Sequence, residues 1–162
     1  MPLDNSPLAP TDFDFIIGDW AVKHQRLKER LNDSDEWEEF NGLTCTTKTL
    51  GGFGNLEDNL IEYPSGDSRA IAIRSYNSNT KQWSIWWLDG RDPSTLGIPV
   101  VGAFQDGIGT FLASDTLEGT PIVVRFIWDA TPLDPTWEQA FSLDQGSTWE
   151  TNWRMTFTRS RD

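Results

Sequence analysis

The chain has 162 residues, close to the commonest size of a single folded domain, and its formal net charge of −12 predicts repulsion of nucleic acids and anionic membrane surfaces. It has no apolar run as long as a membrane span, its N-terminus lacks the pattern of a secretory signal, and Cys45 has no second cysteine to pair with. We therefore expect a cytoplasmic protein stabilised by packing rather than by disulfides, with neither nucleic acid nor membrane as a partner.

Residues 1–11 are rich in proline, and we expect them to form an arm that precedes a domain at residues 12–162. From Trp20 to Arg159, short alternating runs are separated by turn clusters, a pattern typical of an all-β meander. The strands are expected at about 20–30, 37–49, 55–63, 70–76, 81–88, 100–105, 110–117, 121–129, 136–143 and 149–159.

About ten antiparallel strands in an open sheet would leave edges that need protection, whereas a closed sheet has none. We therefore predict a single antiparallel up-and-down β-barrel, lipocalin-like, with a short N-terminal helical turn. The last two strands, 136–143 and 149–159, show the clearest alternation, and we expect the period of two to continue without interruption through both.

Residues 23–31 are the ambiguous segment of the predicted barrel. They are good helix formers, and Leu27 and Leu31 are four residues apart, as on one face of a helix. We prefer a strand because the run continues from Trp20 without a helix-capping signal. The choice decides which way His24 and Arg26 face.

The tripeptide Gly18-Asp19-Trp20 resembles the Gly-x-Trp signature that opens the first strand of lipocalins and other calycin proteins. In those families the tryptophan closes one end of the barrel and an arginine from the last strand packs over it. Arg159 ends the last predicted strand here. The resemblance therefore implies that Trp20 and Arg159 meet in a cation–π contact that closes the barrel.

Further segments make the chain similar to a family of uncharacterised bacterial lipocalin-like proteins over most of residues 13–159. They are 24–31, 51–55, 83–87, 137–141 and 152–153. The resemblance implies a calycin barrel but no reaction. Nitrobindin-like haem proteins share the ten-stranded form, but their glycine-rich first strand and haem-ligating histidine have no match here. We expect no cofactor and no metal.

His24 and Arg26 share a strand face with Trp20 if the first strand alternates regularly. Inside the barrel, they would bind the acidic group of a ligand through charge-assisted hydrogen bonds. A solvated strand face with ion pairs to acidic neighbours is the alternative. A single β-bulge would also reverse the side on which both residues lie.

Glu57 and Asn59 share a face of one strand, and Arg74 lies on the strand that follows, so these polar groups could meet in one cavity. A carboxylate beside His24, either Glu57 or Glu39, would form an acid–base pair with the histidine. The candidate catalytic residues are then His24 and Glu57. Ion pairs on the outer surface would explain the same residue types. The candidate ligand-binding residues are His24, Arg26, Glu57, Asn59, Arg74, Trp86, Trp128 and Gln139.

Tryptophans occupy both faces of residues 83–88, so neither face suits full exposure to water. We assign Trp86 to the interior and place Trp83 and Trp87, with Val101 and Val123, on an outer apolar face that a second subunit would bury in a homodimer. A cover made by the N-terminal arm or by residues 89–99 is the alternative.

Nine tryptophans and nine phenylalanines can wall a cavity, and a few polar groups among them are typical of a small-molecule site. Our leading interpretation is a barrel that binds a partly apolar ligand with a polar or acidic head. An isomerase, cyclase or hydrolase that uses His24 is the second interpretation, and a pocketless barrel that binds another protein is the third.

Overall fold

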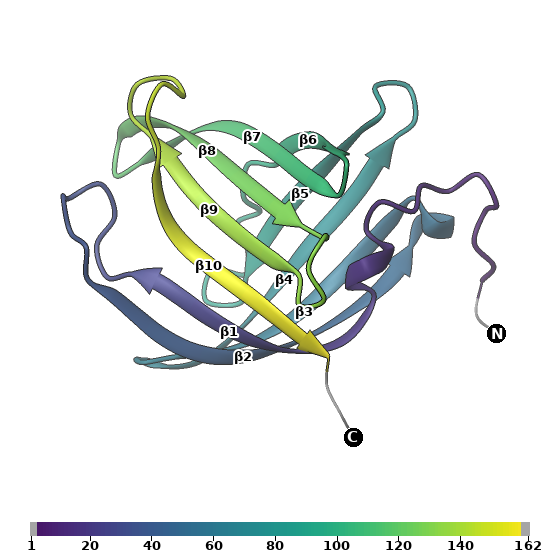
Figure 1. The fold of residues 1–162 in the computed structure, drawn as a ribbon, viewed down its shortest axis with the longest axis horizontal. Helices are drawn as coiled ribbons and strands as arrows, with labels where there is room; N and C mark the ends of the chain where they lie inside the picture. Colours follow the sequence, from purple (N-terminus) through teal and green to yellow (C-terminus); the bar gives the residue numbers. More distant parts are fainter. Residues whose placement is uncertain (1–2, 160–162) are drawn as a thin grey trace.

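A computed structural model describes residues 3–159 and shows a closed barrel of antiparallel strands, as the alternation predicts (Figure 1). Each strand pairs with the next along the chain, and the last pairs with the first. The strands are β1 (Gly18–Leu27), β2 (Trp37–Thr49), β3 (Gly54–Tyr63), β4 (Gly66–Asn77), β5 (Gln82–Asp89), β6 (Val100–Gln105), β7 (Ile108–Leu117), β8 (Thr120–Asp129), β9 (Thr136–Ser142) and β10 (Glu150–Arg159). Up-and-down topology is thereby confirmed.

Helical structure in residues 3–159 is limited to two 3-10 turns, η1 (Asp14–Ile16) and η2 (Leu50–Gly52). The first of these is the short N-terminal helical turn that the sequence predicts. Across the same residues, the chain forms no helix that is long and apolar enough to cross a membrane.

The ambiguous segment forms a strand as far as Leu27, and residues 28–36 then connect it to β2. Within β1, His24 pairs with Phe40 of β2 on one side and with Met155 of β10 on the other. If this segment formed a helix, β2 and β10 would be left as unpaired sheet edges. That cost exceeds the helix propensities of ordinary residues, which differ by less than about 1 kcal/mol per residue.

The two ends of the barrel differ. At one end, Phe13 and Ile16 of the η1 region are buried inside the barrel and form a plug. Phe13 packs edge-on against Trp83 and Phe104. At the other end, strands are joined only by connections at 28–36, 64–65, 90–99, 118–119 and 143–149. The barrel is therefore a cup with a plugged end and an open end.

Closure brings Trp20 and Arg159 together as predicted. The two residues are partners in the β1–β10 register, and the Arg159 Cζ atom lies 3.9 Å from the centre of the Trp20 ring. Arg159 Nη1 donates a hydrogen bond to the Ile17 carbonyl oxygen at 2.6 Å. A Cβ on Gly18 would lie 2.5 Å from that nitrogen, and Gly18 has a φ of +112°, so glycine is required beside the tryptophan.

The expected uninterrupted alternation of the last strand is wrong at one position. The β9–β10 register shifts between Thr151 and Trp153, which places a β-bulge at Asn152. Asn152 is fully buried and accepts a hydrogen bond from Gln139 Nε2 at 2.8 Å. The bulge adds one residue to β10. The consecutive residues Asn152 and Trp153 are therefore both buried, instead of one facing inward and the other outward.

Replacing the closing arginine, Arg159→Met, should lower the free energy of unfolding by about 0.5–2 kcal/mol, because it removes the cation–π contact and the bond that tethers η1. Urea denaturation measures the change. Arg154→Met is the matched control. The Arg154 Cζ atom lies 4.9 Å from the Trp37 ring centre and its Nε lies 3.8 Å from Glu138 Oε2, but within residues 3–159 no hydrogen bond joins Arg154 to η1 or Ile17. Equal losses in the two variants would contradict a special role for Arg159 in closure.

Candidate functional site

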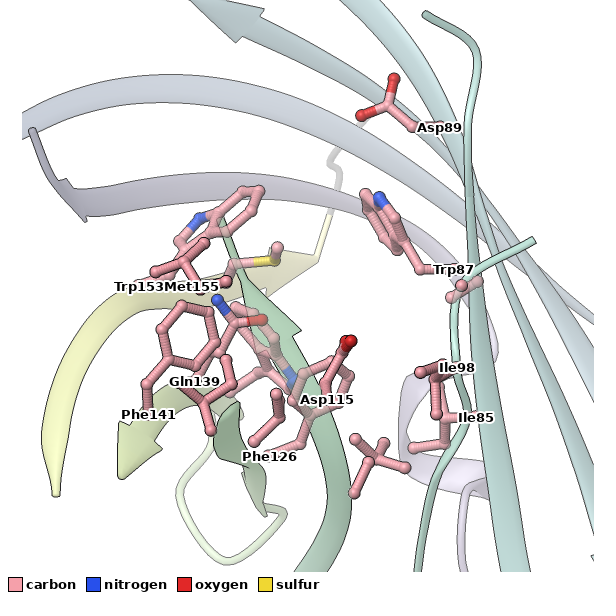
Figure 2. A pocket seen from close by; sticks show the side chains of 18 of the residues that line it. Ile85, Trp87, Asp89, Ile98, Asp115, Phe126, Gln139, Phe141, Trp153 and Met155 are labelled. Atoms are coloured by element: carbon pink, nitrogen blue, oxygen red, sulfur yellow. The ribbon is translucent and has the colours of Figure 1, made fainter. Parts of the chain in front are cut away.

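The barrel interior contains a cavity of about 360 Å³ that reaches the open end. Figure 2 shows Trp153, Met155, Gln139 and Phe141 on one side of this cavity, facing Trp87, Ile85 and Ile98 on the other. The volume lies within the range of small-molecule sites. The apolar lining comprises Tyr63, Ala72, Ile85, Trp87, Ile98, Val100, Ala113, Leu117, Ile122, Val124, Phe126, Trp128, Trp137, Phe141, Trp153 and Met155.

The strands bring Glu57 and Arg74 together inside the barrel. Arg74 Nη2 donates to Glu57 Oε2 at 2.5 Å and Arg74 Nη1 donates to Asn55 Oδ1 at 2.8 Å. The Arg74 Cζ atom also lies 5.0 Å from the ring centre of Phe13 and 5.1 Å from that of Trp128. The Arg74 and Glu57 side chains are 2% and 3% exposed, and the pair lines the cavity on the side of the plug residue Phe13. Its charges compensate each other.

Breaking this buried ion pair should destabilise the fold. Glu57→Leu leaves an unpaired guanidinium in the interior and should cost about 3–5 kcal/mol of unfolding free energy. The double variant Glu57→Leu with Arg74→Met removes both charges and should be more stable than either single variant. Urea denaturation of the wild type and all three variants gives the coupling energy. Additive losses would show that the two side chains do not interact.

Arg26 also lines the cavity, on β1 next to the open end. Its Cζ atom lies 4.8 Å from the Trp153 ring centre and 5.9 Å from that of Tyr63. Burial, followed by repulsion from Arg30, holds the pKa of the Arg26 guanidinium below its ordinary value, whereas Glu38 opposes that shift. No carboxylate in residues 3–159 forms an ion pair with Arg26.

His24 faces inward rather than towards solvent, but it does not line the cavity. Its ring stacks on Phe40, with centres 4.8 Å apart, and its Nδ1 accepts a hydrogen bond from Trp153 Nε1 at 3.0 Å. A Cβ on Gly42 would approach His24 Nε2 to 2.9 Å, so the absence of a side chain at Gly42 makes room for the imidazole. The residue is 1% exposed.

Burial, aided by repulsion from Arg26, lowers the pKa of His24 from 6.5 to about 4, which keeps the ring neutral at pH 7. Glu57 bonds to Arg74, and Glu39 lies exposed beside Lys23. Within the described part of the chain, no ion pair or hydrogen bond joins His24 to a carboxylate. The predicted acid–base pair is therefore not assembled.

The lowered pKa of His24 predicts a pH dependence of stability. The unfolded chain takes up this proton near pH 6.5 and the folded chain near pH 4, so stability is complete above 6.5 and declines as the pH falls towards 4, by up to about 3 kcal/mol. In His24→Gln, an amide oxygen replaces the acceptor but does not titrate. The stability difference between wild type and variant should therefore shrink by that amount between pH 7 and pH 4, measured by urea denaturation. Parallel pH profiles would contradict the assignment.

Arg91, Asp89 and Tyr63 form a second polar group at the open end. Arg91 donates to Asp89 through Nε at 3.0 Å and through Nη2 at 2.8 Å, and its Cζ atom lies 4.6 Å from the centre of the Tyr63 ring. The hydrogen bond from Arg91 holds the pKa of Asp89 below its ordinary value. Asp115 lines the cavity as well.

Of the candidate ligand-binding residues, Trp128 and Gln139 line the cavity, whereas Asn59 is buried beside it and donates to the carbonyl oxygens of Glu57 and Ala70. The prediction for Trp86 is wrong, because this residue does not line the cavity and belongs to the opposite face of β5 from Trp87.

The predicted outer face is wrong at two of its four positions. Trp83 is 2% exposed and donates through Nε1 to Asp12 Oδ2 at 3.0 Å, and Trp87 lines the cavity. Side chains alternate along a strand, so placing Trp86 inward reversed every assignment on β5. Val101 is exposed and Val123 is half-buried on the outer face. Dimer formation stays a prediction.

Sequence reasoning missed several lining residues, among them Tyr63, Trp87, Trp137, Trp153 and Met155. Trp137 could have been found, since it shares a strand face with the predicted Gln139. Trp153 becomes recognisable only when β1 and β10 pair, and Tyr63 of β3 only when the barrel is closed, because their contacts with Arg26 join segments distant in the sequence.

Comparison with protein-family models gave no match, and neither did comparison with curated proteins. Across residues 3–159, no group of three or more His, Cys, Asp or Glu side chains is placed to hold a metal ion. The interior geometry therefore carries the functional argument.

Proposed function

We propose that the protein binds a small, partly apolar molecule with a polar or acidic head in the interior of its barrel. The observation that carries the proposal is the cavity itself, about 360 Å³ in volume and lined mainly by aromatic and aliphatic side chains. A few polar groups among apolar walls orient a ligand while the walls supply burial energy.

The closed end and the open end support the same proposal. The plug formed by Phe13 and Ile16 excludes water from one end, and the connections at the other end leave an entrance. We further infer membership of the calycin group, on the basis of the ten-stranded closure and the Gly18-Asp19-Trp20 signature with Arg159 packed over the tryptophan.

The neutral probe N-phenyl-1-naphthylamine should bind the wild type, with enhanced probe fluorescence and quenching of the tryptophans that line the cavity. Ala113 lines the cavity from β7, so Ala113→Trp fills it and should weaken binding about ten-fold or more. Fluorescence titration measures both affinities.

Ala103→Trp is the matched control, because Ala103 is exposed on β6 and the same side chain added there should leave affinity unchanged. Circular dichroism establishes that both variants are folded. Absence of binding to the wild type, or equal binding to the Ala113→Trp variant, would refute the proposal. Native mass spectrometry of protein purified from its own host would then identify the molecule that is carried.

A further inference from the structure

Arg26 differs from the other two arginines that line the cavity. Arg74 is bonded to Glu57 and Asn55, and Arg91 is bonded twice to Asp89. Within residues 3–159, Arg26 makes neither an ion pair nor a side-chain hydrogen bond, and its Nε is buried without a partner. Among the arginines that line the cavity, Arg26 is therefore the one without an ion-pair partner in residues 3–159, and its charge is uncompensated in that sense.

The surroundings of Arg26 make an uncompensated charge costly. The guanidinium lies over the Trp153 ring, with Tyr63 nearby, and Glu38 is opposite in the β1–β2 register without pairing to it. Burial and the nearby Arg30 both disfavour its charged form. A half-buried cation of this kind would gain from an anion bound at the cavity, because the anion would replace lost hydration with charge-assisted hydrogen bonds.

The position of Arg26 fixes how such a ligand would lie. Arg26 precedes the last residue of β1 at the open end, while the Glu57–Arg74 pair lies towards the plug and is already neutralised. The cavity lining that they share also carries apolar residues, among them Ile85, Val124 and Met155. An amphiphile would therefore enter with its apolar body first and leave its charged group near the mouth.

We propose that the ligand carries one anionic group, a carboxylate or a sulfonate-like oxyanion, and that Arg26 binds it near the mouth of the cavity. This inference rests on the proposed ligand-binding function. The planar guanidinium presents paired N–H donors that match such an oxyanion, and its Cζ atom lies over the Trp153 ring at 4.8 Å from the ring centre. Asp115, also in the lining, would repel a second negative charge.

Two probes with the same aromatic body test the charge of the head group. 1-Anilinonaphthalene-8-sulfonate carries one sulfonate, and N-phenyl-1-naphthylamine carries none. The wild type should bind the sulfonate more tightly, although its net charge of −12 repels anions at long range. Arg26→Met should weaken sulfonate binding about ten-fold and change affinity for the neutral probe less than about two-fold. Fluorescence titrations at fixed ionic strength give the four dissociation constants.

Arg125→Met is the matched control. Arg125 also has a buried, unpartnered Nε and lies with its Cζ atom 4.2 Å from the Trp149 ring centre, but it does not line the cavity. The variant loses the same charge and should keep the preference for the sulfonate. An equal loss in the Arg125 and Arg26 variants would overturn the proposal, as would a preference that survives Arg26→Met.

The remaining outcomes separate this inference from the function on which it rests. Binding of the neutral probe with no preference for the sulfonate would overturn the anionic head group and leave the cavity as a binding site. Failure of the folded wild type to bind either probe would overturn the proposed function and the head-group inference together. Thermal unfolding of each variant, followed by circular dichroism, establishes that the compared proteins are folded.

Discussion

Pairing of β1 with β10 is the constraint on which the rest of the structure depends. It gives every strand two neighbours and thereby divides the side chains into an inner and an outer set. Trp20 and Arg159 secure this junction where the plug meets the barrel. Once Trp20 faces inward, alternation carries His24 and Arg26 inward as well, and the opposing strand brings Trp153 against both.

The interior groups its polar side chains by depth. Near the plug, Arg74 is neutralised by Glu57 and shielded by rings, which suits a structural role in a region of low dielectric constant. His24 is neutral and serves as an acceptor for Trp153. Near the mouth, Arg26 retains an uncompensated charge beside an apolar space. That asymmetry distinguishes the candidate ligand contact from the residues that maintain the fold.

Sequence patterns predicted the barrel and its strand order, because strand alternation and turn chemistry act within a few residues. The contact between Trp20 and Arg159 was implied by the resemblance to lipocalins, and the structure contains it. The face of β5 was predicted wrongly, since tryptophans occur on both faces and hydrophobicity alone does not choose between Trp86 and Trp87. The bulge at Asn152 was not anticipated either. A bulge depends on how β10 fits its neighbour, and no short-range signal specifies it.

The sequence by itself determined that this chain forms an antiparallel β-barrel, and it singled out Arg26, Glu57, Arg74, Trp128 and Gln139 as polar or aromatic candidates that the structure places around the cavity. Only the tertiary structure decided which of them are paired with other side chains and which have no such partner at the cavity in the described part of the chain. Alternation along a strand specifies whether a side chain faces inward or outward. Whether a charged side chain is paired and buried depends on neighbouring residues that are distant in the sequence. Those neighbours pair Arg74, enclose His24 and leave Arg26 beside the cavity.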